Sequence, residues 1–232
     1  MSDHHFTRRK FICGSLAAPL LAGLRTESNA AGGNDGASYR IESIQLYVRV
    51  TPVGRFPVAI GRHKGPAKPE RNSLAHVRMV MRDASGTRTF GCSGDRMSVR
   101  WLDKRPGRSK DLKLRELVKL IERARDVYLR QPHFGSPFDK WLSCHREIHK
   151  AGRAAGQEDL TSSYASALLE RAMLDAVCRL AGRPIFEMVR EDRLGFRPAR
   201  LHPELRDLRP ADYLPGKPVT RFHIRHTVGL AD

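Results

Sequence analysis

Two histidines four residues apart have the types and spacing that could hold a metal ion. His145 and His149 would lie on one face of a helix, with Cys144 beside them. The segment reads His-Arg-Glu-Ile-His, which places the glutamate one position away from the H-E-x-x-H pattern of zinc enzymes. No third ligand follows at a suitable spacing. We therefore interpret the segment as a polar helix face with the cysteine packed inside.

A Gly-Cys-Ser-Gly segment at residues 91–94 has the composition of a nucleophile turn but lacks the G-x-S-x-G spacing. The four cysteines are widely separated, so they indicate neither a disulfide scaffold nor a C-x-x-C zinc site. The sequence therefore assigns no catalytic residue and no metal ligand to this chain.

The charge of the chain is strongly basic, at +17 over 232 residues, with 42 lysines and arginines against 25 acids. The arginine-rich segment 96–113 is interrupted by Asp103 and Asp111, and Trp101 is its one aromatic residue. No nucleic-acid-binding motif accompanies it, so we predict no nucleic-acid partner. No run of about eighteen apolar residues is present, which predicts no stable membrane span.

The N-terminus resembles a bacterial twin-arginine (Tat) export signal over residues 1–30. Arg8-Arg9 precedes a short apolar stretch from Ile12 to Leu24, and Ser28-Asn29-Ala30 offers small residues for cleavage. The alternative is an ordinary basic N-terminus. A Tat signal implies export in the folded state, so we expect a periplasmic or extracellular protein. Residues 31–40 have the composition of a flexible linker.

The elements that must position any site begin with strands. Residues 41–50 alternate between apolar and polar, and shorter strand patterns follow at 77–81 and 87–92. Residues 51–75 hold four prolines and three glycines, which predicts a long loop, and residues 83–86 predict a tight turn. Together these patterns predict a three-stranded antiparallel meander.

The apolar period then becomes helical. We predict helices over 112–129 and 138–151, a third that starts at the capping residues 161–163 and ends at Gly182, and a short fourth over 185–189. Ser109 or Asp111 can cap the first of them. Five prolines in residues 193–218 predict an extended connector, and residues 222–228 a closing strand. The predicted class is α+β, with the strands first and a helical bundle after them.

Three segments carry a family resemblance when they are taken in order. The third strand runs into Gly-Cys-Ser-Gly-Asp at 91–95, and residues 225–229 close the chain. Between them, residues 165–175 fit the pattern A-x-x-x-[IL]-E-x-A-x-x-D, with Glu170 and Asp175 at its acidic positions. The order resembles the N-terminal capping domain of the enolase superfamily, in its mandelate racemase and muconate lactonizing enzyme branch. The family's usual Gly-x-Gly-Glu and Leu-Leu-Gly-Gly segments are altered here, which indicates a divergent subgroup.

The resemblance implies a domain layout and a chemistry. Residues 41–192 would be the capping domain, 193–218 a proline-rich connector, and 219–232 the start of a (β/α) barrel. In the family, the barrel holds Mg²⁺ and the base that removes a proton alpha to a carboxylate, in isomerases and lyases. We expect that this chain lacks those ligands, that its barrel is interrupted or omitted, and that the chain alone is inactive.

The resemblance also implies a place for substrate recognition. The segments 51–75 and 91–104 match loops that close over the barrel mouth, and the first carries Arg62, His63 and Lys64. These three residues, with His226 on the first barrel strand, are the candidate contacts for a small carboxylate substrate. Family members often assemble, so a homo-oligomer is compatible with the resemblance. The alternative function is an exported basic α+β module that binds an anionic ligand without catalysis.

Overall fold

A four-stranded antiparallel sheet forms one layer of the computed structural model, which describes residues 39–52, 71–206 and 208–224. The strands lie in the order β3-β2-β1-β4. Their bounds are Tyr39–Pro52 for β1, Arg71–Asp83 for β2, Arg88–Arg96 for β3 and His133–Phe134 for β4. The predicted meander is thus confirmed, and β4, which is too short for any sequence pattern, extends it beside β1.

The tight turn between β2 and β3 forms where Asp83 to Gly86 predicted it. The Asp83 carboxylate accepts hydrogen bonds from the Ser85 hydroxyl at 2.6 Å and from the Thr87 backbone N–H at 2.9 Å. Gly86 has φ +85°, a left-handed conformation that favours glycine. The turn therefore fixes the register of the hairpin through local hydrogen bonds.

The four predicted helices form in the predicted order with longer bounds, and a short helix that was not predicted precedes them. Together they are a short α1, three long helices and a short α5, with bounds α1 Val99–Leu102, α2 Lys110–Arg130, α3 Pro137–Ala154, α4 Asp159–Ala181 and α5 Ile185–Arg190. Ser109 caps α2 by accepting a hydrogen bond from the Leu112 N–H, and Gly182 ends α4 with φ +61°. The sequence predicted Gly182 as a cap, and Ser109 was one of the two candidates for the cap of α2.

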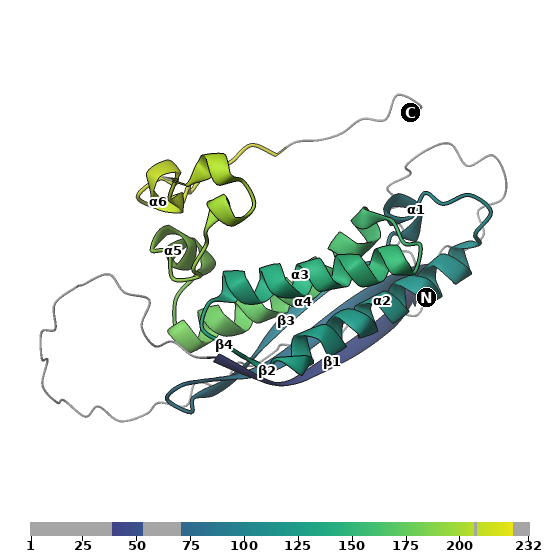
Figure 1. Cartoon of the computed structure of the whole chain (residues 1–232), viewed down its shortest axis with the longest axis horizontal. Coiled ribbons are helices and arrows are strands. Elements are labelled where there is room, and N and C mark those ends of the chain that lie inside the picture. Colours follow the sequence, from purple (N-terminus) through teal and green to yellow (C-terminus); the bar gives the residue numbers. More distant parts are fainter. Residues whose placement is uncertain (1–38, 53–70, 207, 225–232) are drawn as a thin grey trace, which may run out of the picture. The chain divides into compact units, whose positions relative to one another are not determined.

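Helix α4 is the centre of the core. It lies between the sheet and α3, and it also contacts α2 (Figure 1). Seven of its apolar residues have no measurable solvent exposure: Ala165, Leu168, Leu169, Ala172, Met173, Ala176 and Val177. A helix covered on several sides needs apolar residues around most of its circumference, which accounts for its Ala- and Leu-rich sequence.

The start of α4 corrects one prediction. The helix begins at Asp159 after Glu158, so Thr161 lies within its first turn instead of capping it. The Thr161 hydroxyl is buried and donates a 2.8 Å hydrogen bond to the Leu102 carbonyl of α1. A hydroxyl that finds a tertiary partner has no need of a capping role.

Several predicted segment boundaries also shift. Tyr39 and Arg40 belong to β1 instead of the linker, and β2 begins at Arg71, inside the predicted 51–75 loop. The 193–218 segment is not extended, since it contains two 3-10 turns and a short helix α6. These are Pro198–Arg200, Pro203–Leu205 and, for α6, Pro210–Tyr213.

The C-terminal strand predicted over 222–228 is only partly described. Residues 222–224 have no regular secondary structure, and 225–228 lie outside the described residues. Within the described ranges, no helix is both long enough and apolar enough to cross a bilayer. The fold class, an α+β domain with an antiparallel sheet followed by helices, is confirmed.

Candidate functional site

The predicted substrate-contact residues fall outside the described residues. Arg62, His63 and Lys64 lie in the 53–70 segment, and His226 lies in 225–232. Their placement stays a prediction. The structure does describe the strands and turns from which these segments leave.

The two predicted lid segments leave from the same end of the sheet. Pro52 at the end of β1 pairs with Arg71 at the start of β2, and Leu74 pairs with Arg96 at the end of β3. The chain after β3 stays at this end, because the Met97 N–H donates a 2.8 Å hydrogen bond to the Ser73 carbonyl. The antiparallel topology therefore brings the base of the 51–75 loop and the 97–104 segment together.

The segment after β3 presents an aromatic side chain beside a cation. Val99 and Leu102 of α1 are buried and anchor the turn, while Trp101 is 68% exposed. The Lys104 ammonium lies 5.1 Å from the centre of the Trp101 ring, within the range of a cation–π interaction. This pair offers a stacking surface with positive charge at the lid end of the sheet.

A buried charge network holds that segment in place. Arg105 donates to Asp103 at 2.6 Å and also contacts Glu116 and Gln157, and Lys113 donates to the Asp103 carbonyl at 2.9 Å. Hydrogen bonding by Arg105 holds the pKa of the Asp103 carboxyl below its usual range. Asp103 is 3% exposed, so losing Arg105 would leave this buried carboxylate with Lys113, 3.8 Å away, in place of a hydrogen-bonded ion pair.

The Gly-Cys-Ser-Gly-Asp segment is structural. A Cβ added to Gly91 would lie 2.1 Å from the Ala172 carbonyl oxygen and 2.3 Å from the Ala176 nitrogen, so only glycine lets α4 lie this close to β3. The Ser93 hydroxyl donates to the Leu168 carbonyl at 2.6 Å. These contacts explain the small residues of the segment without any nucleophilic role.

The acidic residues of the α4 motif have two different environments. The Asp175 carboxylate accepts the Cys92 N–H at 2.8 Å, on the outer edge of β3, and also pairs with Arg179 at 3.1 Å. Glu170 is half-buried, and burial raises the pKa of its carboxyl to about 7. Burial raises the pKa of Tyr128 well above its ordinary value, and the negative charge of Glu170 adds to that shift.

The histidine pair on α3 is engaged by α4. His145 Nδ1 lies 3.1 Å from the Ser166 hydroxyl, while His149 contacts Asp159 through Nδ1 and Ser163 through Nε2, both at 3.2 Å. Burial lowers the pKa of His145, and the neighbouring His149 lowers it further. Both ring nitrogens of His149 are thus occupied by helix–helix contacts. Across the ranges that the structure describes, no group of three His, Cys, Asp or Glu residues is placed to hold a metal ion.

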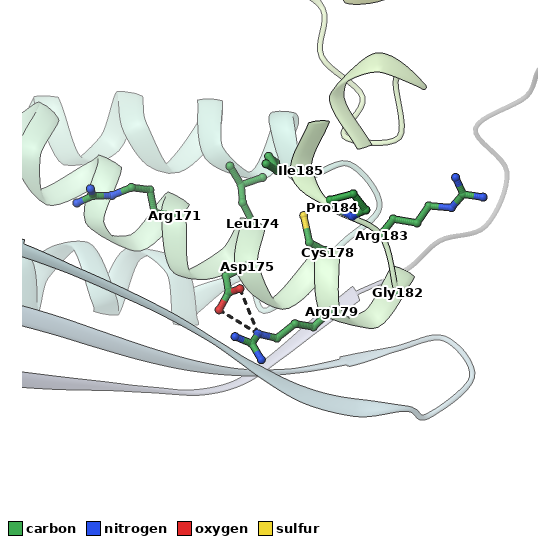
Figure 2. Close-up of a pocket in the computed structure, with 9 residues that line it drawn as sticks. All are labelled: Arg171, Leu174, Asp175, Cys178, Arg179, Gly182, Arg183, Pro184 and Ile185. Carbon is green, nitrogen blue, oxygen red and sulfur yellow. Dashed lines mark hydrogen bonds and ion pairs between the residues drawn. The ribbon is translucent and has the colours of Figure 1, made fainter. Parts of the chain in front are cut away.

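A pocket of about 640 Å³ lies between α4 and α5, and nine residues line it (Figure 2). Its three guanidinium groups are all paired: Arg171 with Asp95, Arg179 with Asp175, and Arg183 with Glu187 and Glu191. Burial raises the pKa of the Cys178 thiol, which keeps the thiol protonated and poorly nucleophilic. The side chains that line the pocket are therefore paired or protonated, and none of them is an activated nucleophile.

Comparison with known proteins gives two structural neighbours. No protein-family model matches the sequence, and no characterised protein matches it. L-talarate/galactarate dehydratase from Salmonella typhimurium LT2 is 17% identical with a TM-score of 0.42, over 72% of this chain and 37% of that one. An enolase from Bradyrhizobium, in complex with magnesium and mandelic acid, is 20% identical with a TM-score of 0.41, over 70% and 42%.

Both neighbours are longer chains than this one. The chain spans about two fifths of the length of each.

Proposed function

We propose that residues 41–192 form the capping domain of an enolase-superfamily enzyme of the mandelate racemase and muconate lactonizing enzyme type. The observation that carries the proposal is the contact between the two motifs of the resemblance. Gly91 fits beneath the backbone of α4, and Asp175 of α4 accepts the N–H of the adjacent Cys92. Cys92 and Asp175 are 83 residues apart in the chain, and their hydrogen bond connects β3 with α4.

The role of this domain would be to select the substrate. The base of the 51–75 segment and the 97–104 segment meet at one end of the sheet, which is the arrangement that two lids over a common pocket require. Arg62, His63 and Lys64 would contact the carboxylate of a small substrate from the first segment, and His226 from the first barrel strand. The exposed Trp101 would add an apolar wall to this lid.

The chemistry itself would belong to the barrel. When bound there, Mg²⁺ stabilises the charge that develops as a proton leaves the carbon alpha to a carboxylate. In this scheme the described residues of this chain bind, enclose and orient the substrate. We propose that they do not catalyse the reaction by themselves. With the Tat-like signal at residues 1–30, the assembled enzyme would act in the periplasm or outside the cell.

The DNA that follows codon 232 gives the first test. We expect a reading frame, in phase or shifted, that encodes a barrel with spaced Asp and Glu ligands and a Lys or His base. An unrelated gene in that position would refute the assignment to a capping domain.

A second test measures the role of the lid. Residues 31–232 would be co-expressed with that barrel, and exchange of the alpha proton of small carboxylates would be followed by NMR in D₂O with Mg²⁺. We expect the triple variant Arg62→Gln, His63→Gln, Lys64→Gln to raise KM with little change in kcat. The matched control is the helix α2 double variant Arg115→Gln, Arg123→Gln, which should leave KM unchanged. Equal KM values for the two variants would refute the lid role.

A further inference from the structure

A row of four basic side chains crosses the sheet on the face opposite the helices. The register pairs Arg88 with Arg82, Arg82 with Arg40, and Arg40 with His133, one residue from each strand. Residues paired directly across neighbouring strands point to the same face, and all four are exposed. We call Arg88, Arg82, Arg40 and His133 the basic row.

The row is only partly neutralised by the protein. Glu42 lies at a bulge in β1 between Ile41 and Ser43, and its side chain contacts the row on this face. Its carboxylate bridges Arg82 at 2.6 Å and Arg88 at 2.5 Å, and these contacts, with Arg88 first, lower its pKa. Like charges directly opposite one another destabilise a sheet, and two of the three arginines here share this carboxylate.

The neighbouring pair of the row, Arg40 and Arg82, carries the same charges but, in the described part of the chain, has no carboxylate between its two guanidinium groups. Arg40 and Arg82 are paired in register as Arg82 and Arg88 are, yet among the described residues no carboxylate lies between them. The nearest acid along β2, Asp83, is used by Ser85 and Thr87 in the turn. The Glu42 carboxylate thus shows how a carboxylate fits between Arg82 and Arg88. A ligand carboxylate would fit between Arg40 and Arg82 in the same way.

We propose that the basic row binds an acidic polysaccharide, a polyuronate chain laid across the strands. Strands lie about 4.8 Å apart, so an extended polyanion that crosses them passes Arg82, Arg40 and His133 within a short length of chain. Planar guanidinium groups suit carboxylates, and charge complementarity selects the occupant. One exposed ion pair contributes little, so the row binds a chain through several contacts and a single sugar hardly at all.

The surroundings of the row favour a sugar chain over a nucleic acid. Single-stranded nucleic acids bind through aromatic rings on which their bases stack. Phe90, the aromatic residue on this face of β3, has the Arg78 guanidinium 4.7 Å and the Arg179 guanidinium 5.5 Å from its ring centre. Its faces are therefore engaged by protein cations. This inference is independent of the proposed capping role, because it uses the opposite face of the sheet and none of the lid residues.

The test is binding of fluorescently labelled oligogalacturonate to the full chain, followed by fluorescence anisotropy at several salt concentrations. We expect affinity that falls steeply with salt and no detectable binding of monomeric galacturonate. The double variant Arg40→Gln, Arg82→Gln should weaken binding roughly tenfold, since each exposed pair contributes up to about fivefold. The control Arg115→Gln, Arg123→Gln removes the same charge from exposed positions on α2 and should bind like the wild type.

Three outcomes would overturn the proposal. One is equal weakening by the two double variants, which would mean attraction by net charge alone. Another is binding of the monomer as tight as that of the chain. The third is tighter binding, at equal charge concentration, of a thymidine homopolymer or of inorganic polyphosphate. Thermal unfolding followed by circular dichroism confirms that both double variants are folded, so a loss of binding reports on the row.

Discussion

Replacing Glu170 with glutamine should make the protein more stable at alkaline pH. Burial raises the pKa of this carboxyl from 4.5 to about 7, because the folded state disfavours its charged form. The unfolded chain has no such preference. The contribution of Glu170 to the free energy of unfolding is therefore greatest below pH 4.5. It falls as the pH rises towards 7 and changes little above that.

The size of the effect follows from the shift. At 1.36 kcal/mol per pKa unit, a change from 4.5 to about 7 corresponds to on the order of 3 kcal/mol. Solvent reaches part of the side chain, so we expect about 2 kcal/mol. Glutamine has nearly the same shape and no charge to bury. Glu170→Gln should thus exceed the wild type by about 2 kcal/mol at pH 8 and match it at pH 4.

The assay is urea unfolding, followed by circular dichroism, of wild type and variant at pH 4, 6 and 8. Taking the difference between the two proteins cancels the other titrating groups, including His145. Glu122→Gln is the matched control, since Glu122 is an exposed glutamate on α2, and its difference from wild type should stay near zero at all three values. A Glu170→Gln difference that does not grow between pH 4 and pH 8 would refute the reasoning.

Three further predictions concern the joints of the fold, each read as the free energy of unfolding. Gly91→Ala should cost about 3 kcal/mol because the added Cβ would overlap the α4 backbone. Gly94→Ala should cost under about 1 kcal/mol, since its close contact is with the end of the His76 side chain, which can move. Equal costs for the two variants would contradict this reasoning. Asp175→Ala should cost about 1–2 kcal/mol by leaving the Cys92 N–H without its acceptor, and Asp175→Asn less, because the amide oxygen can still accept. Arg105→Ala should cost about 3 kcal/mol and expose 97–109 to limited proteolysis, while Arg115→Ala should do neither.

The sequence predicted those interactions in which a residue contacts its own neighbours in the chain. Ser109 and Gly182 were recognised as caps because each satisfies backbone groups within a few residues. Thr161 was misplaced because its hydroxyl bonds to Leu102, 59 residues away, and no local pattern records that partner. Strand β4 was not predicted because two residues are too few to show an alternating pattern. They form a strand by pairing with Tyr39 and Arg40.

The four predicted substrate contacts lie outside the described residues and stay predictions, whereas the residues of the family resemblance can be compared with the structure. A resemblance in residue order identified Gly91, Glu170 and Asp175, but their contacts show that they join the helix to the sheet or are buried, so their roles are structural. The basic row was not predicted because its residues come from different strands and only the strand register aligns them. Alternation within single strands could have placed each arginine on the outer face, but not in one row.

The contact of Asp175 with the outer edge of β3 also has a consequence for how the chain is made. On the ribosome, the hairpin of β2 and β3 emerges long before α4, whose acceptor lies 83 residues downstream of Cys92. Until that helix is synthesised, the N–H groups along β3 are free to pair with another nascent chain. Late closure also makes this contact slow to form, because it joins distant parts of the sequence. Translation that pauses after β3 has left the ribosome and before α4 is complete would therefore prolong the interval in which the protein is most prone to aggregate.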